Sequence, residues 1–323
     1  VCTFFQLWSE SSRLGKLTWN KEEQLVDWFS SRSGPIPILL HSTCMMAPKY
    51  LIVNADDFGT DRERSKGILQ AGQSGIVTTT SIMANLIGDP ESLHPVQETF
   101  GNRIGVHLNL TFGAPLTKNV RTLTREDGLF FSKPVAWRKA LGRQLDLTEV
   151  KKELSSQVQQ LLTCGISPDH LDGNNHIHVF PGINAVVAGI AEEFGIRRIR
   201  VPFESFRHWA DLFRPHGLKK LLMGCLCQLT RPVFRQHGIV FTDHFAGIQF
   251  PVVASVHSLQ TFLEKLPSGT TELMCHPGYA NLQANPFSNV EREQELFSLT
   301  HPVIRETLQR YRIILTSYSE LEP

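Results

Sequence analysis

The chain has no apolar segment long enough to cross a membrane. A transmembrane helix needs roughly 18 consecutive apolar residues. The longest apolar stretch, around residues 220–229, is interrupted by Gly224 and Gln228. The apolar stretch Ile36–Leu40 is too short for the hydrophobic core of a signal peptide. We therefore expect neither a membrane span nor a signal peptide.

Cysteine is scarce and unpatterned. The six cysteines show none of the paired spacings of a zinc ribbon. Cys225 and Cys227 lie in an apolar stretch of helical character, which favours a place in the core over a redox site. Because a chain of 323 residues does not depend on disulfides for its stability, we expect a reducing, cytoplasmic location.

The chain also lacks an excess of charge of either sign. Its 32 Lys and Arg residues against 31 Asp and Glu residues give a net charge of +1, so no global field favours nucleic acid. The first strand candidate is not followed by G-x-G-x-x-G, which argues against a dinucleotide site. The expected partner is a small molecule, and a homo-oligomer remains open.

The first 46 residues differ from the rest. Ser31–Pro37 is rich in Ser, Gly and Pro, and Met45 and Met46 stand just before the first strong strand candidate. We predict that residues 1–46 are an extension outside the fold and that residues 47–323 form one catalytic domain.

Residues 47–323 alternate between strand and helix patterns, which predicts parallel βαβ units. The expected fold is α/β and barrel-like, with seven or eight mainly parallel strands surrounded by helices; an open doubly wound sheet is the alternative. The long connection 112–145 is typical of a lid or binding loop. The strand candidates are Tyr50–Ala55, Thr78–Met83, Ile104–Leu110, His170–Asp172, Arg197–Val201, Ile239–Thr242, Thr271–Cys275 and Ile313–Thr316. The helix candidates are Arg62–Gln73, Leu147–Leu162, Ile183–Phe194, Lys219–Arg235, Val256–Leu266 and Val290–Arg310.

Polar residues stand at or near the ends of several strand candidates. Asp56 and Asp57 follow an apolar run, His107 lies inside the third strand candidate, and His276 follows Cys275. A single such residue is often a helix cap or a satisfied core histidine. Several of them at strand ends indicate a catalytic site, because polar groups are costly to bury without partners.

These motifs resemble the YdjC family of carbohydrate deacetylases, which includes chitooligosaccharide deacetylases. The matching segments, which span about residues 49–320 in the family's order, are Asn54–Gly59, Gly105–His107, His170–Asp172, His176–His178, Thr242–Asp243 and Cys275–Pro277. The resemblance implies that residues 47–323 form a divalent-metal-dependent hydrolase domain that removes acetyl groups from N-acetylated sugars.

The resemblance also implies roles for individual residues. Asp56 is expected to be the general base, and Asp57 and His107 to be metal ligands. The third ligand position, usually histidine, is Asn174 in this chain. An amide oxygen binds Mg²⁺ but is a poor ligand for Zn²⁺. We therefore expect Mg²⁺, with Zn²⁺, Mn²⁺ or Co²⁺ as alternatives, and either Asn174 or a neighbouring histidine as the third ligand.

The remaining candidates surround this centre. His276 is the candidate general acid, because Pro277-Gly278 would turn it into the mouth of the barrel. Asp172 is expected to orient a histidine. His176 and His178 would share one face if their segment were extended. Asp243 would bind a sugar hydroxyl or orient His276.

The function predicted from these residues is a metal-dependent N-deacetylase of an oligosaccharide or a lipid-linked amino sugar. Two alternatives remain open, an amidase or esterase acting on a non-sugar substrate and a non-catalytic sugar-binding protein. A glycosidase is disfavoured, because two carboxylates adjacent in sequence do not readily flank a glycosidic bond.

Overall fold

A parallel sheet of seven strands forms the centre of the computed structural model, which describes residues 47–204, 217–248, 252–281, 283 and 287–322. The expectation for residues 1–46 therefore lies outside the described residues. The strand order is β4-β3-β2-β1-β6-β5, and β7 also pairs with β1. The strands are β1 Lys49–Phe58, β2 Thr79–Ile82, β3 Ile104–Leu108, β4 Leu171–Gly173, β5 His244–Ala246, β6 Gly269–Cys275 and β7 Ile313–Thr316.

Strand β1 organises the sheet because it pairs with three others. Its first half lies beside β7, from Lys49 opposite Ile313 to Ile52 opposite Thr316, and its second half lies beside β2. Strand β6 pairs with its other edge. Every pairing is parallel, and the sheet curls into a half-barrel, which confirms the expected α/β barrel-like class. The carboxyl ends of the strands therefore meet at one edge.

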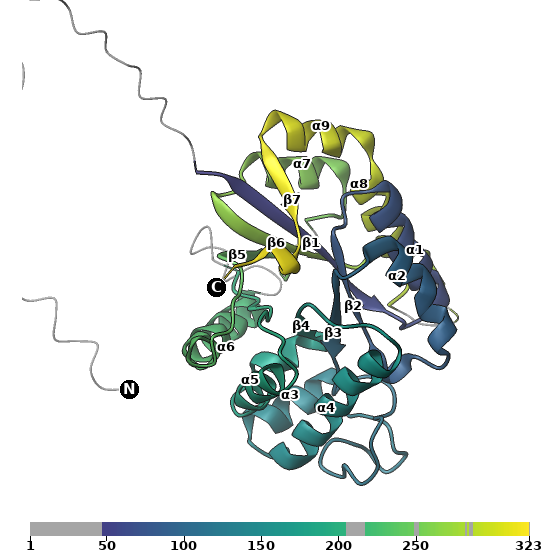
Figure 1. Ribbon diagram of the computed structural model, residues 1–323, viewed down its shortest axis with the longest axis vertical. Helices are drawn as coiled ribbons and strands as arrows, with labels where there is room; N and C mark the ends of the chain where they lie inside the picture. The colour runs from purple at the N-terminus through teal and green to yellow at the C-terminus, as the bar shows by residue number, and fades with distance from the viewer. Residues whose placement is uncertain (1–46, 205–216, 249–251, 282, 284–286, 323) are drawn as a thin grey trace, which may run out of the picture. The chain divides into compact units, whose positions relative to one another are not determined.

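Helices surround the sheet (Figure 1). Helix α4 packs on β3 and on α5, and α1 packs on β1, α2 and α8. None of the described helices is both long enough and apolar enough to cross a bilayer. The helices are α1 Arg62–Ser74, α2 His94–Phe100, α3 Lys133–Leu141, α4 Leu147–Thr163, α5 Ile183–Glu193, α6 Gly217–Gln236, α7 Val256–Glu264, α8 Val290–Thr300 and α9 Pro302–Arg310.

Two predicted strands are reduced to single bridges. Arg197–Val201 and Ile239–Thr242 contribute only the pairs Leu171–Ile199 and Arg198–Val240. Pro202, which has no backbone N–H, follows the first of them directly. Strand β5 starts only at His244, after the predicted strand has ended.

The helix predictions differ in two places. The connection 112–145, in which no helix was predicted, contains α3, whose first turn includes Pro134. The single helix predicted over Val290–Arg310 is divided into α8 and α9. Pro302 cannot donate the backbone hydrogen bond that would continue α8, and the side chain of His301 accepts one from Val303 N instead.

Candidate active site

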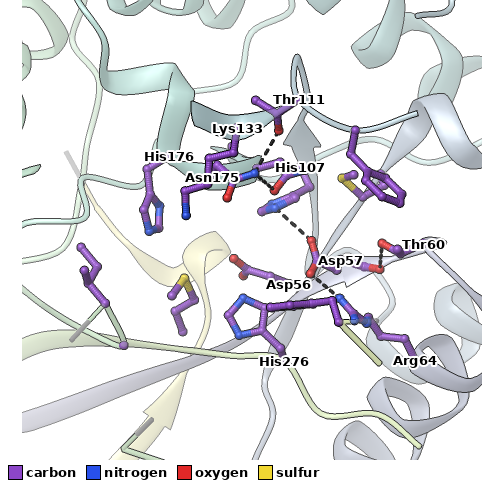
Figure 2. Close-up of a pocket in the computed structure, with 18 of the residues that line it drawn as sticks. Asp56, Asp57, Thr60, Arg64, His107, Thr111, Lys133, Asn175, His176 and His276 are labelled. Atoms are coloured by element: carbon purple, nitrogen blue, oxygen red, sulfur yellow. Dashed lines mark hydrogen bonds and ion pairs between the residues drawn. The ribbon is translucent and has the colours of Figure 1, made fainter. Parts of the chain in front are cut away.

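A cavity of about 780 Å³ lies at the carboxyl edge of the sheet (Figure 2). Six strands each bring to it a residue at or just beyond their carboxyl ends. These residues are Asp57 of β1, Met83 after β2, His107 of β3, Asn174 after β4, Gly247 after β5 and His276 after β6. Chain positions up to 219 residues apart thus converge because parallel strands all end at this edge.

Asp56 is held by a fully buried arginine. Arg200 donates from Nη1 to Asp56 Oδ2 at 2.6 Å and from Nη2 to Asp56 Oδ1 at 2.7 Å. Asn54 Nδ2 adds a third hydrogen bond, to Asp56 Oδ1, at 2.7 Å. Such a bidentate pair with a charged donor fixes the plane of the carboxylate, and Asp56 still borders the cavity.

Arg200 also binds two further carboxylates. Nη1 lies 2.9 Å from Asp172 Oδ2, and Nε donates to Glu272 Oε1 at 2.7 Å. Tyr318 donates its hydroxyl to the other oxygen of Glu272. Arg200, Asp172, Glu272 and Tyr318 are all fully buried. Because each donor of the planar guanidinium has an acceptor, Arg200 has one orientation, with its forked end on Asp56.

Asp57 presents one oxygen to an arginine and the other to a histidine. Arg64 Nη1 lies 2.6 Å from Asp57 Oδ2, and His107 Nε2 lies 3.3 Å from Asp57 Oδ1. The backbone of Asp57 has a φ of 74°, in the left-handed region that aspartate tolerates better than most residues. Burial opposes its charge, but His107 and Arg64 together keep the pKa of Asp57 well below its usual value.

His107 connects Asp57 with Asp172. Its Nδ1 lies 2.8 Å from Asp172 Oδ1, and Ser81 donates to the other oxygen of Asp172 at 2.9 Å. This contact would allow Asp172 to orient the ring of His107. Burial opposes protonation of the imidazole, but Asp172 and Asp56 nevertheless raise the pKa of His107 to about 10.

The site contains donors suited to a divalent cation. One ligand atom from each of Asp56, His107 and Asp172 lies within 4.8 Å of the others, so this buried group could hold a metal ion. Arg200 already binds the two aspartates of that group. Asp57 Oδ1 and His107 Nε2 form a second pair of converging donors, which Arg200 does not contact. Carboxylate and imidazole donors fit a divalent metal.

Asn174 borders the cavity. Its side chain belongs to a chain of amides. Nδ2 donates to Asn109 Oδ1 at 3.2 Å, and Oδ1 accepts from Asn175 Nδ2 at 3.0 Å. An amide oxygen with only one neutral donor keeps a lone pair for a cation.

The structure places His176 and His178 in different surroundings, although their rings lie edge-on with 6.5 Å between centroids. The segment Asn174–Val179 is a 3₁₀ turn rather than an extended strand, and Asn175 and His176 have φ values of 53° and 57°. His176 borders the cavity. His178 is fully buried, with Nε2 2.9 Å from Arg200 O. Because the turn places the two rings in different surroundings, the two histidines do not share a face.

His276 faces the cavity opposite His107 and His176 (Figure 2). Its backbone N–H donates to Glu295 Oε2 at 2.6 Å, which anchors the turn that follows β6. The ring packs edge-on against Phe287, with 5.7 Å between ring centroids. Burial lowers the pKa of His276 to about 4, although Asp56 and Asp57 act in the opposite direction. The imidazole is therefore neutral at pH 7 and must gain a proton before it can donate one.

Asp243 is not part of this arrangement. It is exposed, and its Oδ2 accepts a hydrogen bond from Thr270 N at 2.8 Å. The motif Thr242–Asp243 precedes β5 and does not end a strand. Asp243 therefore lies near the amino end of β6, whereas Cys275 and the cavity lie at its carboxyl end.

Several residues of the site had no motif to identify them. Arg200 binds Glu272, and Glu272 binds Tyr318, each far away in the sequence, whereas Arg64 binds Asp57 from the helix that follows β1. Lys133 and Lys219 also border the cavity. The one available signal was Arg200 itself, a charged residue between the apolar residues Ile199 and Val201.

Comparison with known proteins identifies the family. The family model described as YdjC-like protein matches residues 50–310. A carbohydrate deacetylase of Mus musculus is 31% identical over 84% of this chain and 94% of its own length. A carbohydrate deacetylase of Geobacillus stearothermophilus is 29% identical over 84% of this chain and 98% of its own length.

A solved structure supports the fold. A crystal structure from Enterococcus faecalis V583, described as a cellobiose-phosphate cleavage protein, superposes with a TM-score of 0.69 at 23% identity. It covers 86% of this chain and 100% of its own. The chain therefore belongs to the YdjC-like family, and its relatives across most of its length are carbohydrate deacetylases.

Proposed function

We propose that this protein is a metal-dependent deacetylase that hydrolyses the acetamide of an N-acetylated carbohydrate and releases acetate. The observation that carries the proposal is the arrangement of Asp56, Asp57, His107 and His276 around one cavity. The names of the relatives support a sugar as the substrate. We further propose that the substrate is an oligosaccharide resembling chitin fragments or a lipid-linked amino sugar.

Asp57, His107 and Asn174 would hold the metal. Arg64 occupies Asp57 Oδ2, which leaves Oδ1 beside His107 Nε2 for a cation. Two oxygen donors and one imidazole favour Mg²⁺, and Mn²⁺, Co²⁺ or Zn²⁺ would use the same atoms. A bound divalent ion lowers the pKa of a water molecule and polarises the acetyl carbonyl.

Asp56 is the proposed general base. Arg200 and Asn54 fix its carboxylate at the edge of the cavity, so that it can accept the proton of an attacking water. Asp172 and Glu272 share the charge of Arg200. The single charge of Arg200 is therefore shared among three carboxylates and is not held by Asp56 alone.

His276 is the proposed proton donor to the departing amine. The turn held by Glu295 directs its ring into the cavity. Since the imidazole is neutral at pH 7, it would receive a proton in the course of the reaction and then pass it to the amine nitrogen. Phe287 packs edge-on against the ring.

The test is acetate release from N-acetylated chitooligosaccharides by the wild type and by Asp56→Asn. The amide keeps the shape of the side chain but cannot accept the proton, so we expect release by the wild type and a fall of at least about 100-fold in the variant. Equal rates would refute the role of Asp56. Ester cleavage without acetate release from any sugar would favour an esterase, and sugar binding without turnover would favour a binding protein.

A further inference from the structure

Arg64 is a buried arginine in the wall of the cavity and the third residue of α1. Its side chain is 1% exposed, and its Nη1 donates to Asp57 Oδ2 at 2.6 Å. The guanidinium therefore lies on the carboxylate that we propose as a metal ligand. A hydrogen bond between two charged groups at this distance is among the strongest in proteins. A metal ion at Asp57 would thus have a fixed positive charge as its neighbour.

Three contacts other than that with Asp57 hold Arg64 in place. Nη2 donates to Ser288 Oγ at 3.1 Å, and the fully buried Ser288 in turn donates to Asp61 Oδ2 at 2.5 Å. The guanidinium lies over the ring of Phe287, 4.6 Å from its centroid. The backbone N–H of Arg64 donates to Asp61 Oδ1 at 2.8 Å, which caps α1. Because these contacts do not involve Asp57, the guanidinium would stay beside that carboxylate when a metal is bound.

The start of α1 is also packed against the turn that follows β6. The backbone N–H of Tyr279 donates to Glu63 O at 3.1 Å. A Cβ at Gly278 would lie 3.2 Å from Arg64 Cα, so the two backbones approach closely. These contacts fix the backbone from which the guanidinium reaches Asp57.

The contact with Arg64 leaves Asp57 with one oxygen for a metal. Figure 2 shows His107 and Arg64 reaching Asp57 from opposite sides, and the oxygen near the histidine is Oδ1, 3.3 Å from His107 Nε2. An ion bound by both oxygens of Asp57 would lie close to the guanidinium, and two cations repel each other. The carboxylate is therefore restricted to one metal bond, through Oδ1.

Divalent ions differ in how well they accept this restriction. Mg²⁺ demands octahedral geometry, keeps several water ligands and needs few carboxylates. Ca²⁺ is larger, takes about six to eight oxygen ligands and often binds a carboxylate through both oxygens. As ligands, Asp57, neutral His107 and Asn174 together carry one negative charge, which Arg64 offsets, and the affinity for Ca²⁺ depends on the charge of the ligands. The site therefore favours the smaller ions.

We propose that Arg64 determines the metal selectivity of this site, because it occupies Asp57 Oδ2, limits the carboxylate to one metal bond and so disfavours Ca²⁺ relative to Mg²⁺ and Mn²⁺. The proposal rests on the proposed function, which needs a metal at Asp57. Arg64 acts through Asp57 and touches neither the substrate nor the metal. Selectivity of this kind comes from a repulsive neighbour as much as from the ligands themselves.

The test is calorimetric titration of EDTA-stripped protein with Mg²⁺, Mn²⁺ and Ca²⁺. The variants are Arg64→Met, which removes the charge and the donors, and Arg64→Lys, which retains a cation. The matched control is Arg292→Met. Arg292 borders the same cavity and lies 4.8 Å from the centroid of the Phe287 ring, but it pairs with Glu295 and not with Asp57. Asp57→Asn should abolish binding, which would assign the titrated ion to this site. Thermal midpoints would verify that each variant is folded.

We expect the wild type to bind Mg²⁺ at least about tenfold more tightly than Ca²⁺. Arg64→Met should raise the affinity for Ca²⁺ at least about tenfold and reduce the preference for Mg²⁺ over Ca²⁺ by about the same factor. Arg64→Lys should keep the preference of the wild type, since its ammonium can donate to the same oxygen. Arg292→Met should leave both affinities unchanged.

The titrations separate this proposal from the deacetylase function. An unchanged ratio of the Mg²⁺ and Ca²⁺ affinities in folded Arg64→Met that still binds metal would overturn the role of Arg64 and leave the deacetylase intact. A shifted ratio in a protein that releases acetate from no sugar would support Arg64 and refute the deacetylase. Absence of divalent-ion binding in the wild type and in every variant would contradict both. If Arg64→Met does not fold, Arg64→Gln, whose neutral side chain is too short to reach Asp57, replaces it under the same criterion.

Discussion

Arg200 holds both carboxylate oxygens of Asp56, at 2.6 and 2.7 Å, from a fully buried position. The same guanidinium also binds Asp172 and Glu272, so one cation serves three carboxylates. The ion pair between Arg200 and Asp56 joins β1 to the segment that follows α5. The orientation of the proposed base therefore depends on a residue 144 positions away in the chain.

Replacement of Arg200 tests this dependence. Arg200→Lys keeps one positive charge but cannot bind Asp56 at two points while also reaching Glu272. We expect kcat to fall on the order of 100-fold, because a misplaced base costs about that much, while KM and metal affinity change little. Steady-state kinetics with a calorimetric metal titration would measure this, and a variant with an unchanged kcat would show that Arg200 is only structural.

Asn174 is the proposed ligand whose replacement tests the metal preference. Asn174→His would place an imidazole where the amide now borders the cavity, and imidazole is the better ligand for Zn²⁺. We expect the affinity for Zn²⁺ to rise on the order of tenfold relative to Mg²⁺ in calorimetric titrations of metal-stripped protein. Asn174→Ala is the paired variant. It should weaken Mg²⁺ binding, and an unchanged affinity would mean that Asn174 is not a ligand.

Stability without metal should be greatest near pH 6.5. The pKa of His107, about 10 in the folded state against 6.5 unfolded, contributes stability that is complete below pH 6.5 and lost as the pH rises toward 10. The pKa values of His178 and His276, about 4, contribute stability that is present above pH 6.5 and lost as the pH falls toward 4.

Urea unfolding in EDTA at pH 5, 6.5 and 8.5 would measure this profile. We expect the free energy of unfolding to fall by at least about 1 kcal/mol on each side of the maximum, since one pKa unit corresponds to about 1.4 kcal/mol. Saturating Mg²⁺ should flatten the alkaline side, because a metal ligand must be deprotonated and His107 would release its proton on binding. The same alkaline decline with and without Mg²⁺ would argue against His107 as a ligand.

The close approach of α1 to the turn after His276 gives a packing test. A Cβ at Gly67 would lie 2.4 Å from Gly278 Cα, so Gly67→Ala must displace the turn. We expect a loss of about 2 kcal/mol in stability and a lower kcat. Gly189 in α5 has no heavy atom within 4 Å of the added methyl group, and Gly189→Ala should stabilise the helix by up to about 1 kcal/mol. Equal melting temperatures for both variants would show that α1 does not constrain the turn.

The strand-end motifs were predictable because they are local. The apolar run before Asp56 and Asp57 is a buried strand, and the helices Arg62–Ser74, Leu147–Thr163 and Ile183–Glu193 agree with their periodic patterns to within a few residues. The parallel alternation of strands and helices then explains why their polar ends meet.

The features of the site that the sequence did not predict depend on tertiary contacts, which no local sequence pattern reports. The partners of Arg200 lie on β1, β4 and β6, and the turn Asn174–Val179 places His176 and His178 in different surroundings through two left-handed residues. Asp243 was misplaced because the strand beside it begins after the motif rather than before it. Lys133 was not predicted as a site residue, because it begins helix α3 and the sequence analysis predicted no helix in that connection.

The most direct test of the central proposal is acetate release from N-acetylated chitooligosaccharides by protein stripped with EDTA and then supplied with Mg²⁺, Mn²⁺, Co²⁺ or Zn²⁺. We predict no release from the stripped protein and restored release with a divalent ion, most strongly with Mg²⁺ or Mn²⁺. Undiminished release after complete removal of metal, or no release from any sugar with any ion by the folded protein, would contradict the proposed metal-dependent deacetylase.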